Sequence, residues 1–130
     1  MAIVDEGGLP VSLLIASASP HEITLLKDVI RSRFVHRRIE KLTGDKAYDS
    51  DRMDKELAQK GTELNAPHRS GRKSPHTQDG RKLRPYRRRW KVERFFAWLF
   101  SFRKCVVRYE YKDQNFFAFL LLASALMMIK

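Results

Sequence analysis

The last part of the chain, from Phe116 to Ile129, is almost wholly apolar, and a fold of this chain must bury much of it. The run holds 14 residues and is interrupted by Ser124. A membrane-spanning helix needs about 20 apolar residues, so this run is too short to cross a bilayer. The sequence therefore predicts an apolar helix over 115–129 that packs in the core. A helix lying in a membrane interface is the alternative.

Patterns upstream of this run predict strands and helices in alternation. Apolar runs between turn residues predict short strands at 2–4, 9–18, 39–43 and 63–66, with an extended segment at 105–111. Apolar positions at helical spacing predict helices at 22–33, 50–60 and 85–103. Residues 67–84 are rich in proline, glycine, serine and charge, which predicts a basic loop. The expected fold class is α/β, in one domain that covers 1–130.

Positive charge is concentrated between His68 and Arg94. The chain has a formal net charge of +11. This stretch contains eleven basic residues and only two acidic residues. The basic residues are Arg69, Arg72, Lys73, Arg81, Lys82, Arg84, Arg87, Arg88, Arg89, Lys91 and Arg94. Clustered arginines suit phosphate, because each neutralised phosphate releases a counterion and the guanidinium pairs bidentately. Nucleic acid is therefore the first partner to consider and an acidic membrane surface the second, while a solvated basic face is the alternative.

Cysteine content and the N-terminal residues narrow the class of protein further. Cys105 is the only cysteine, which excludes an internal disulfide and a zinc site built from cysteines. The first residues contain neither a cationic region nor an apolar run, so we expect no signal peptide. These features predict an intracellular basic domain.

Asp45 and Glu93 are the acidic residues best placed for chemistry. Asp45 follows the strand expected at 39–43, and loops at strand ends open into the crevice of an α/β sheet. A turn or capping role for Asp45 is the alternative. On the helix expected at 85–103, Tyr86, Arg89 and Glu93 fall within an arc of about 60°, on a partly apolar face. A carboxylate there needs a partner: either Arg89 one turn earlier, or a divalent metal shared with Asp45.

Two motifs resemble those of a known family. Gly44-Asp45-Lys46-Ala47-Tyr48-Asp49-Ser50 is the first, and Tyr86-x2-Arg89-x3-Glu93 follows it. Together with Val4-Asp5-Glu6-Gly7-Gly8 and Ala18-Ser19-Pro20-His21-Glu22, they resemble the catalytic half of bacterial insertion-sequence transposases of the DDE type. The resemblance covers nearly the whole chain, with the four blocks in the family's order.

The resemblance implies a ribonuclease-H-like mixed sheet with flanking helices, and metal-dependent DNA strand cleavage and strand transfer. In this family three carboxylates hold two Mg²⁺ ions, which Mn²⁺ can replace. Asp45 would be the second acid, just past the fourth strand, and Glu93 the third, on the following helix. Tyr86 and Arg89 would orient Glu93 or bind phosphate. Lys46, Arg87 and Arg88 would contact the DNA backbone.

The chain departs from the family pattern at two points. In the family signature a lysine follows the glutamate with six residues between them, and that position here is Phe100. Arg103 or Lys104 could substitute for this lysine. The first acid should lie on a strand before the opening hairpin, where Asp5 is the nearest candidate and a turn residue the alternative. We therefore expect a sheet that lacks its first strand at the N-terminus, and a chain inactive alone. It would be a second reading-frame product joined by frameshifting, or a remnant.

The partners follow from the same resemblance. They are double-stranded DNA at the element ends and the target, an upstream transposase segment that supplies the first Asp, and a second copy of the chain. The expected location is the bacterial cytoplasm, at the nucleoid when DNA is bound, with no membrane partner. A basic DNA-binding module that binds no metal, or an inactive transposase remnant, is the alternative.

Overall fold

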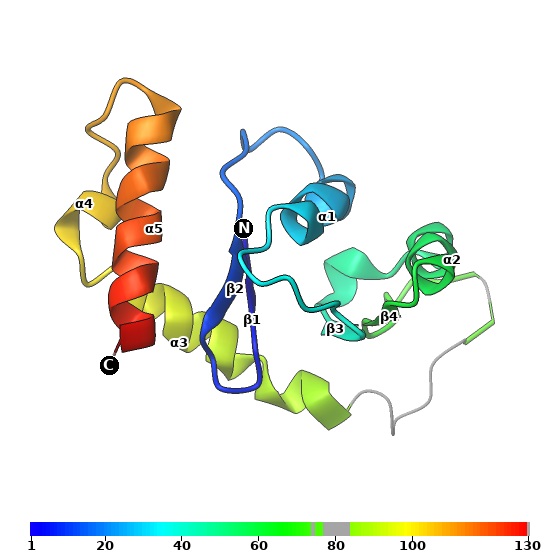
Figure 1. The fold of residues 1–130 in the computed structure, drawn as a ribbon. Coiled ribbons are helices and arrows are strands. Elements are labelled where there is room, and N and C mark those ends of the chain that lie inside the picture. The colour runs from blue at the N-terminus through cyan, green and yellow to red at the C-terminus, as the bar shows by residue number, and fades with distance from the viewer. Residues whose placement is uncertain (74, 77–83, 130) are drawn as a thin grey trace. The chain divides into compact units, whose positions relative to one another are not determined.

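The chain folds as two units, each assembled from segments that are distant in the sequence. A computed structural model describes residues 1–73, 75–76 and 84–129. The first unit contains Met1–Ser19, Lys27–Val35 and Trp90–Lys130, and the second contains Pro20–Leu26 and His36–Arg89. Figure 1 labels the helices and strands of both units. Each unit is described separately below.

A β-hairpin opens the first unit. Strand β1 (Ala2–Val4) pairs antiparallel with β2 (Pro10–Leu13), with Ala2 opposite Leu13 and an irregularity between Ile3 and Val4. The Asp5 carboxylate accepts the backbone N–H groups of Gly7 and Leu9 at 2.8 and 2.9 Å. These bonds confirm the turn role that the sequence allows for Asp5.

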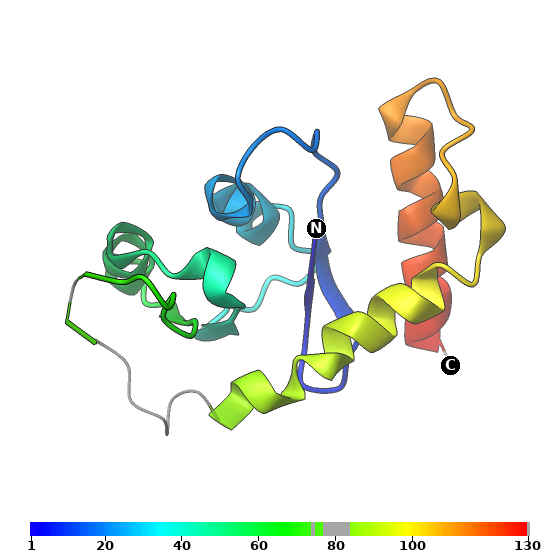
Figure 2. The same ribbon diagram turned by 180° about the vertical axis from the view of Figure 1, so that it is seen from behind.

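Three helices lie wholly within the first unit: α3 (Trp90–Leu99), α4 (Arg103–Val106) and α5 (Asp113–Ile129). Figure 2 shows α4 beside α5, and the two helices are in contact. The core contains Leu13, Phe95, Leu99, Cys105 and Ala123.

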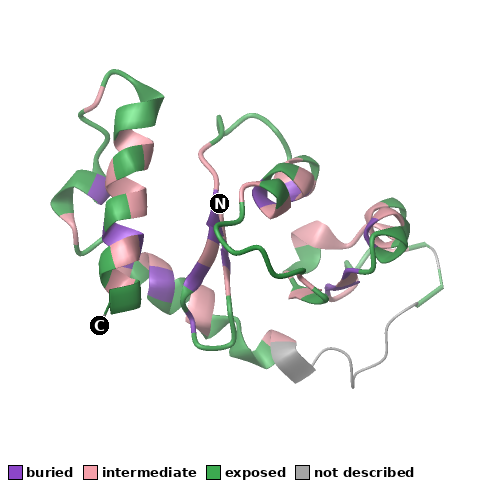
Figure 3. Ribbon diagram, in the orientation of Figure 1, coloured by how far each residue is buried: buried purple, intermediate pink, exposed green. Residues whose placement is uncertain are grey.

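Helix α5 confirms the apolar helix expected at the end of the chain, but only one side of it is buried. Ala123 and Ser124 are buried, whereas Leu122 and Ile129 remain exposed (Figure 3). No helix in the described part of the chain combines the length and apolarity that a membrane span requires.

The second unit is built around a strand–helix–strand segment. Strand β3 (Lys41–Thr43) and β4 (Glu63–Asn65) are parallel, with Leu42 opposite Leu64. Between them lie the 3₁₀ helix η1 (Lys46–Tyr48) and α2 (Asp51–Gln59). The Ser50 hydroxyl caps α2 by accepting the Met53 N–H, and Gly61 has a φ of +68° just beyond the helix. This left-handed conformation favours glycine, so the sequence correctly locates both ends of α2.

Helix α1 (Glu22–Arg31) confirms the helix expected at 22–33. Its first residues belong to the second unit and its later residues, from Lys27, to the first. Leu26 and Val29 are buried at 3% and 0% exposure. The helix is amphipathic, as the spacing of its apolar residues predicts.

The expected single mixed sheet is not observed among the described residues. There are two separate two-stranded sheets, one antiparallel and one parallel. The strand expected at 9–18 is limited to Pro10–Leu13, because its partner β1 is only three residues long. The α/β class is confirmed, and the sheets are small.

For residues 85–111 the structure has the expected helix that carries Glu93, but with other bounds, and it contradicts one expected extended segment. The helix expected at 85–103 is instead the 3₁₀ helix η2 (Arg84–Arg88) followed by α3, which begins at Trp90 and ends at Leu99. The positive end of a helix dipole disfavours cations, so the α-helix begins after three consecutive arginines. The segment 105–111, expected to be extended, begins in α4, which places Cys105 in the core.

Candidate functional site

Asp45 lies where the sequence predicts, directly after β3. The Gly44 N–H donates to the Asn65 carbonyl at 3.0 Å and so extends the pairing of β3 with β4 by one residue. Asp45 then caps η1, and its Oδ1 accepts the Ala47 N–H at 2.8 Å. The residue is exposed. The capping role is therefore observed, and the carboxylate makes no second hydrogen bond within the described residues.

Tyr48 forms one side of this turn. Its side chain is half-buried and hydrogen-bonded to Glu22. Burial raises the pKa of the Tyr48 phenol well above its usual value, and the charges of Glu22 and Asp45 add to the rise. The phenol is therefore neutral, and it stands within electrostatic range of the Asp45 carboxylate.

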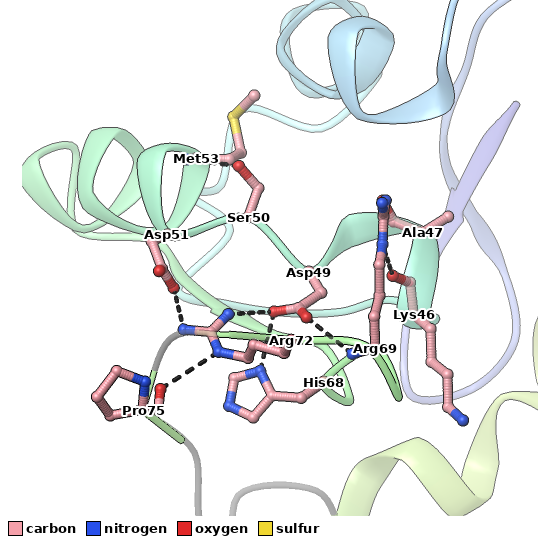
Figure 4. Close-up of polar contacts among 10 residues, drawn as sticks. All are labelled: Lys46, Ala47, Asp49, Ser50, Asp51, Met53, His68, Arg69, Arg72 and Pro75. Atoms are coloured by element: carbon pink, nitrogen blue, oxygen red, sulfur yellow. Dashed lines mark hydrogen bonds and ion pairs between the residues drawn. The ribbon is translucent and has the colours of Figure 1, made fainter.

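A buried carboxylate, Asp49, lies just beyond η1 (Figure 4). Its Oδ1 accepts from His68 Nδ1 at 2.9 Å and from Arg72 Nη1 at 2.8 Å, and its Oδ2 accepts the Arg69 N–H at 2.8 Å. The side chain is 5% exposed. Burial by itself would raise the Asp49 pKa, but these hydrogen bonds and the charge of Arg72 outweigh it and leave the pKa below its usual value.

Two arginines predicted to bind DNA join this cluster. Arg72 pairs with both Asp49 and Asp51, and its side chain is 9% exposed. Its pKa is raised above its usual value, chiefly by the hydrogen bond with Asp51. Arg69 donates from Nε to the Lys46 carbonyl at 3.0 Å and from Nη2 to the Ala47 carbonyl at 2.9 Å. Both guanidinium groups therefore have partners within the protein.

The cluster forms because β3 and β4 are parallel. The carboxyl ends of parallel strands meet at one edge of a sheet, so the loop after β3 meets the loop after β4. Together they line an open pocket of about 400 Å³, and the lining includes Asp49, Ser50 and Arg72. Sequence reasoning did not identify His68 or Asp49 as partners. The signal available was an aspartate and a histidine, each a few residues beyond a predicted strand.

Glu93 lies in the first turn of α3 and is exposed. The buried residues of this helix are Phe95 and Leu99. The partly apolar face that contains Glu93 is therefore the face toward solvent, with Trp90 47% and Phe100 49% exposed. The expected burial penalty on the carboxylate does not arise, because apolar residues on a helix do not by themselves define its core side.

Tyr86 and Arg89 do not share an α-helix with Glu93, so the arc expected for these three residues is wrong. They lie in and just after η2, before α3 begins. Arg89 Nη1 donates to the Tyr86 hydroxyl at 2.9 Å, and its guanidinium carbon lies 5.4 Å from the centre of the Tyr86 ring. These two residues support each other, within the second unit.

The remaining basic residues differ in what they contact. Lys91 donates to the Glu6 carbonyl, and Arg94 donates to the Gly7 carbonyl at 3.1 Å, so both connect α3 to the β1–β2 turn. Lys104 pairs with Glu110 at 3.9 Å, and Arg103 is exposed. Of these remaining residues, Lys46, Lys73, Arg87 and Arg88 lie on the second unit and are exposed. Arg81, Lys82 and the side chain of Arg84 lie outside the described part.

The two predicted metal ligands belong to different units, Asp45 to the second and Glu93 to the first. The described residues contain no group of three or more histidine, cysteine, aspartate or glutamate side chains that could hold a metal ion. Asp45 and Glu93 each offer carboxylate oxygens, the ligand type that Mg²⁺ and Mn²⁺ prefer.

Comparison with known proteins gives a family match over nearly the full chain. Residues 1–128 match the family model described as "Transposase DDE domain". A curated protein from Burkholderia cepacia, "Putative transposase for insertion sequence element IS402", is 31% identical over 95% of this chain. The chain spans 59% of that relative's length. No solved structure matches.

Proposed function

The chain belongs to the DDE transposase domain family, and on that premise we propose that it supplies two carboxylates of a catalytic centre that cuts and joins DNA. The reaction would be metal-dependent strand cleavage and strand transfer for an insertion-sequence element. The observation that carries the proposal is Asp45, an exposed carboxylate at the end of β3, in a turn fixed by neighbouring side chains. A ribonuclease-H-like architecture belongs to the same proposal, and the β3–α2–β4 segment would be one of its parts.

The residues that would hold the metal are Asp45 and Glu93. Both are exposed carboxylates, and their chemistry suits Mg²⁺, with Mn²⁺ as a substitute. In a two-metal site, the bound ions activate the attacking oxygen and stabilise the leaving oxygen of an in-line displacement. Asp45 uses Oδ1 to cap η1, so Oδ2 is the atom that would ligate.

Two carboxylates are fewer than the triad of this family requires. We propose that the third comes from an upstream transposase segment, and that this chain is inactive by itself. A second copy of the chain is a further candidate partner.

DNA would bind through the exposed basic residues. Arg87 and Arg88 are exposed, and neither side chain makes a hydrogen bond or ion pair with the described residues. Lys46 follows Asp45 directly and is also exposed, which suits a phosphate contact next to the proposed metal ligand. The protein would act in the bacterial cytoplasm, at the nucleoid.

Metal titration tests the proposal on this chain. Mn²⁺ added to isotope-labelled protein should broaden the amide signals next to Asp45 and those next to Glu93. Because the two carboxylates would share one centre, Asp45→Asn and Glu93→Gln should each weaken both effects. Unchanged broadening in both variants would overturn the assignment of these carboxylates to the metal.

A non-catalytic DNA-binding module is the second candidate, and the observation that favours it is the low number of ligands among the described residues. DNA affinity distinguishes the two. A module that binds no metal gives the same affinity with Mg²⁺ and with a chelator, and a steep dependence on salt. If the chain is catalytic, Mg²⁺ should increase the DNA affinity of the unmodified chain and should not increase that of Asp45→Asn.

A further inference from the structure

We propose that Arg69 is a positioning residue for Asp45, because its guanidinium closes the turn that carries the Asp45 carboxylate. The inference rests on the proposed function in one respect only, the assignment of Asp45 to the metal. The turn itself is a property of the second unit, where all the residues concerned lie.

The geometry links Arg69 to Asp45 through η1, and Figure 4 shows Arg69 beside Lys46 and Ala47. Arg69 Nε and Nη2 donate to the carbonyls of Lys46 and Ala47 at 3.0 and 2.9 Å. The N–H of the same Ala47 donates to Asp45 Oδ1 at 2.8 Å. One planar guanidinium thus binds the carbonyls of the two residues that follow Asp45, and the backbone N–H of the second, Ala47, holds the Asp45 carboxylate.

The turn needs this support because η1 is only three residues long. Its own bonds are Tyr48 N–H to the Asp45 carbonyl at 3.1 Å and Asp49 N–H to the Lys46 carbonyl at 3.3 Å. Short 3₁₀ helices have poor hydrogen-bond geometry, and the carbonyls at their ends lack helical partners. Arg69 supplies a partner to the Ala47 carbonyl and a second one to the Lys46 carbonyl.

Asp49 fixes Arg69 in turn. Its Oδ2 accepts the Arg69 backbone N–H at 2.8 Å, and its Oδ1 binds His68 and Arg72. The loop after β4 is therefore anchored on a buried carboxylate, and the Arg69 side chain extends from that anchor to η1. The resulting sequence of contacts runs from Asp49 through Arg69 to the turn of Asp45.

A positioning role and a purely electrostatic role predict opposite effects on metal affinity. Arg69 is a cation near the proposed metal ligand, so Coulomb repulsion alone means that its removal should strengthen Mn²⁺ binding. If Arg69 orders the turn, its removal should weaken Mn²⁺ binding, because residues that orient a metal ligand contribute to affinity. The sign of the change therefore separates the two roles.

The experiment measures Mn²⁺ affinity from the broadening of the Ala47 and Tyr48 amide signals in this chain. We expect Arg69→Gln to weaken binding about tenfold. Arg69→Lys keeps the charge but replaces the two-pronged donor with a single ammonium, and it should also weaken binding. Arg52→Gln removes the same charge from an exposed ion pair on α2, and it should leave the affinity unchanged.

A second readout needs no metal. Hydrogen exchange of the backbone N–H groups at residues 47–49 should become faster in Arg69→Gln and in Arg69→Lys, and not in Arg52→Gln. Circular dichroism confirms that each variant is folded. Unchanged exchange in both Arg69 variants would overturn the structural link between Arg69 and the turn.

The controls keep this inference separate from the proposed function. Asp45→Asn preserves the oxygen that caps η1 and should abolish the broadening at Ala47 and Tyr48. If Asp45→Asn leaves the broadening intact, the metal assignment fails, whereas the exchange data still test the turn. If Asp45→Asn abolishes it but Arg69→Gln gives equal or tighter binding, the positioning role of Arg69 is refuted and the proposed function stands.

Discussion

The ring of Tyr48 lies directly over Gly44, so closely that a Cβ atom on Gly44 would be 2.7 Å from Cδ2 of the ring. Folded proteins do not sustain such a contact, so any other residue at this position displaces the ring or the backbone. Gly44 and Tyr48 flank Asp45 and its turn. The close approach therefore explains why the motif around Asp45 contains a glycine and an aromatic residue at this spacing.

Gly44→Ala should destabilise the protein by about 1–3 kcal/mol, the usual cost of overpacking, and urea-induced unfolding measures it. Gly71→Ala is the matched control, since a Cβ at Gly71 would meet no atom of the described residues within 4 Å. The control should change the free energy of unfolding by less than about 0.5 kcal/mol. Equal effects of the two substitutions would contradict the contact between Gly44 and Tyr48.

Asp49→Ala should be among the most destabilising single substitutions in the second unit, at about 3 kcal/mol. It leaves the buried groups of His68 and Arg72 without their shared acceptor, and breaking a buried ion pair from one side is costly. Chemical denaturation measures the loss. Arg52→Gln, which breaks the ion pair with Glu56 from its exposed side, should lower the free energy of unfolding by no more than about 0.5 kcal/mol.

Asp49 should also make stability dependent on acid pH. Its pKa in the folded protein is lowered, so the folded state favours the charged form more than the unfolded state does. The stabilisation is complete above the unfolded pKa, near 3.9. It is lost as the pH falls through the lower folded value. Unfolding measured from pH 6 to about pH 2 should show this loss in the unmodified chain, and a flatter profile in Asp49→Asn.

Asp54 should have the opposite effect. Its pKa is raised, first by burial and then by the charges of Asp51 and Asp49, and its buried Oδ1 has no hydrogen-bond partner within the described residues. The penalty appears as the pH rises from the unfolded to the folded pKa and persists at neutral pH. Asp54→Asn should therefore raise the melting temperature at pH 7 and have less effect at pH 3. A variant less stable at pH 7 would refute the assignment.

Replacement of Arg87 and Arg88 by glutamine should weaken DNA binding without loss of stability. Both side chains are exposed, and each phosphate contact contributes about 0.9 to the slope of log affinity against log salt concentration. The double variant should reduce the slope by up to about 1.8. Fluorescence anisotropy at several salt concentrations measures it. An unchanged slope would exclude these two arginines from the DNA contact.

Local signals determined several elements of this fold from the sequence. Helix α2 is one case, because Ser50 and Gly61 mark its ends by side-chain capping and by a left-handed backbone angle. The hairpin turn at Asp5 is another. Each depends on residues within a few positions of one another. The place of Asp45 at a strand end follows in the same way, from the apolar residues before it and the glycine beside it.

Longer-range features needed the tertiary structure. The start of α3 at Trp90 needed the structure for a different reason, because two local signals compete there: helical spacing and the charge of three consecutive arginines at the helix terminus. Which face of α3 is buried depends on the position of the β1–β2 hairpin, and Glu93 proved to lie on the exposed face. Helical spacing identifies an apolar face, but the element that packs against it decides whether that face is the core.

The sequence by itself determined the family, the Asp45 and Glu93 motifs and the concentration of positive charge, since all of these are patterns of neighbouring residues. Only the tertiary structure decided what Arg69 and Arg72 contact. In the sequence they are two members of a basic cluster. In the folded chain the parallel pairing of β3 with β4 brings them to Asp49, because loops that leave parallel strands meet at the same edge of the sheet.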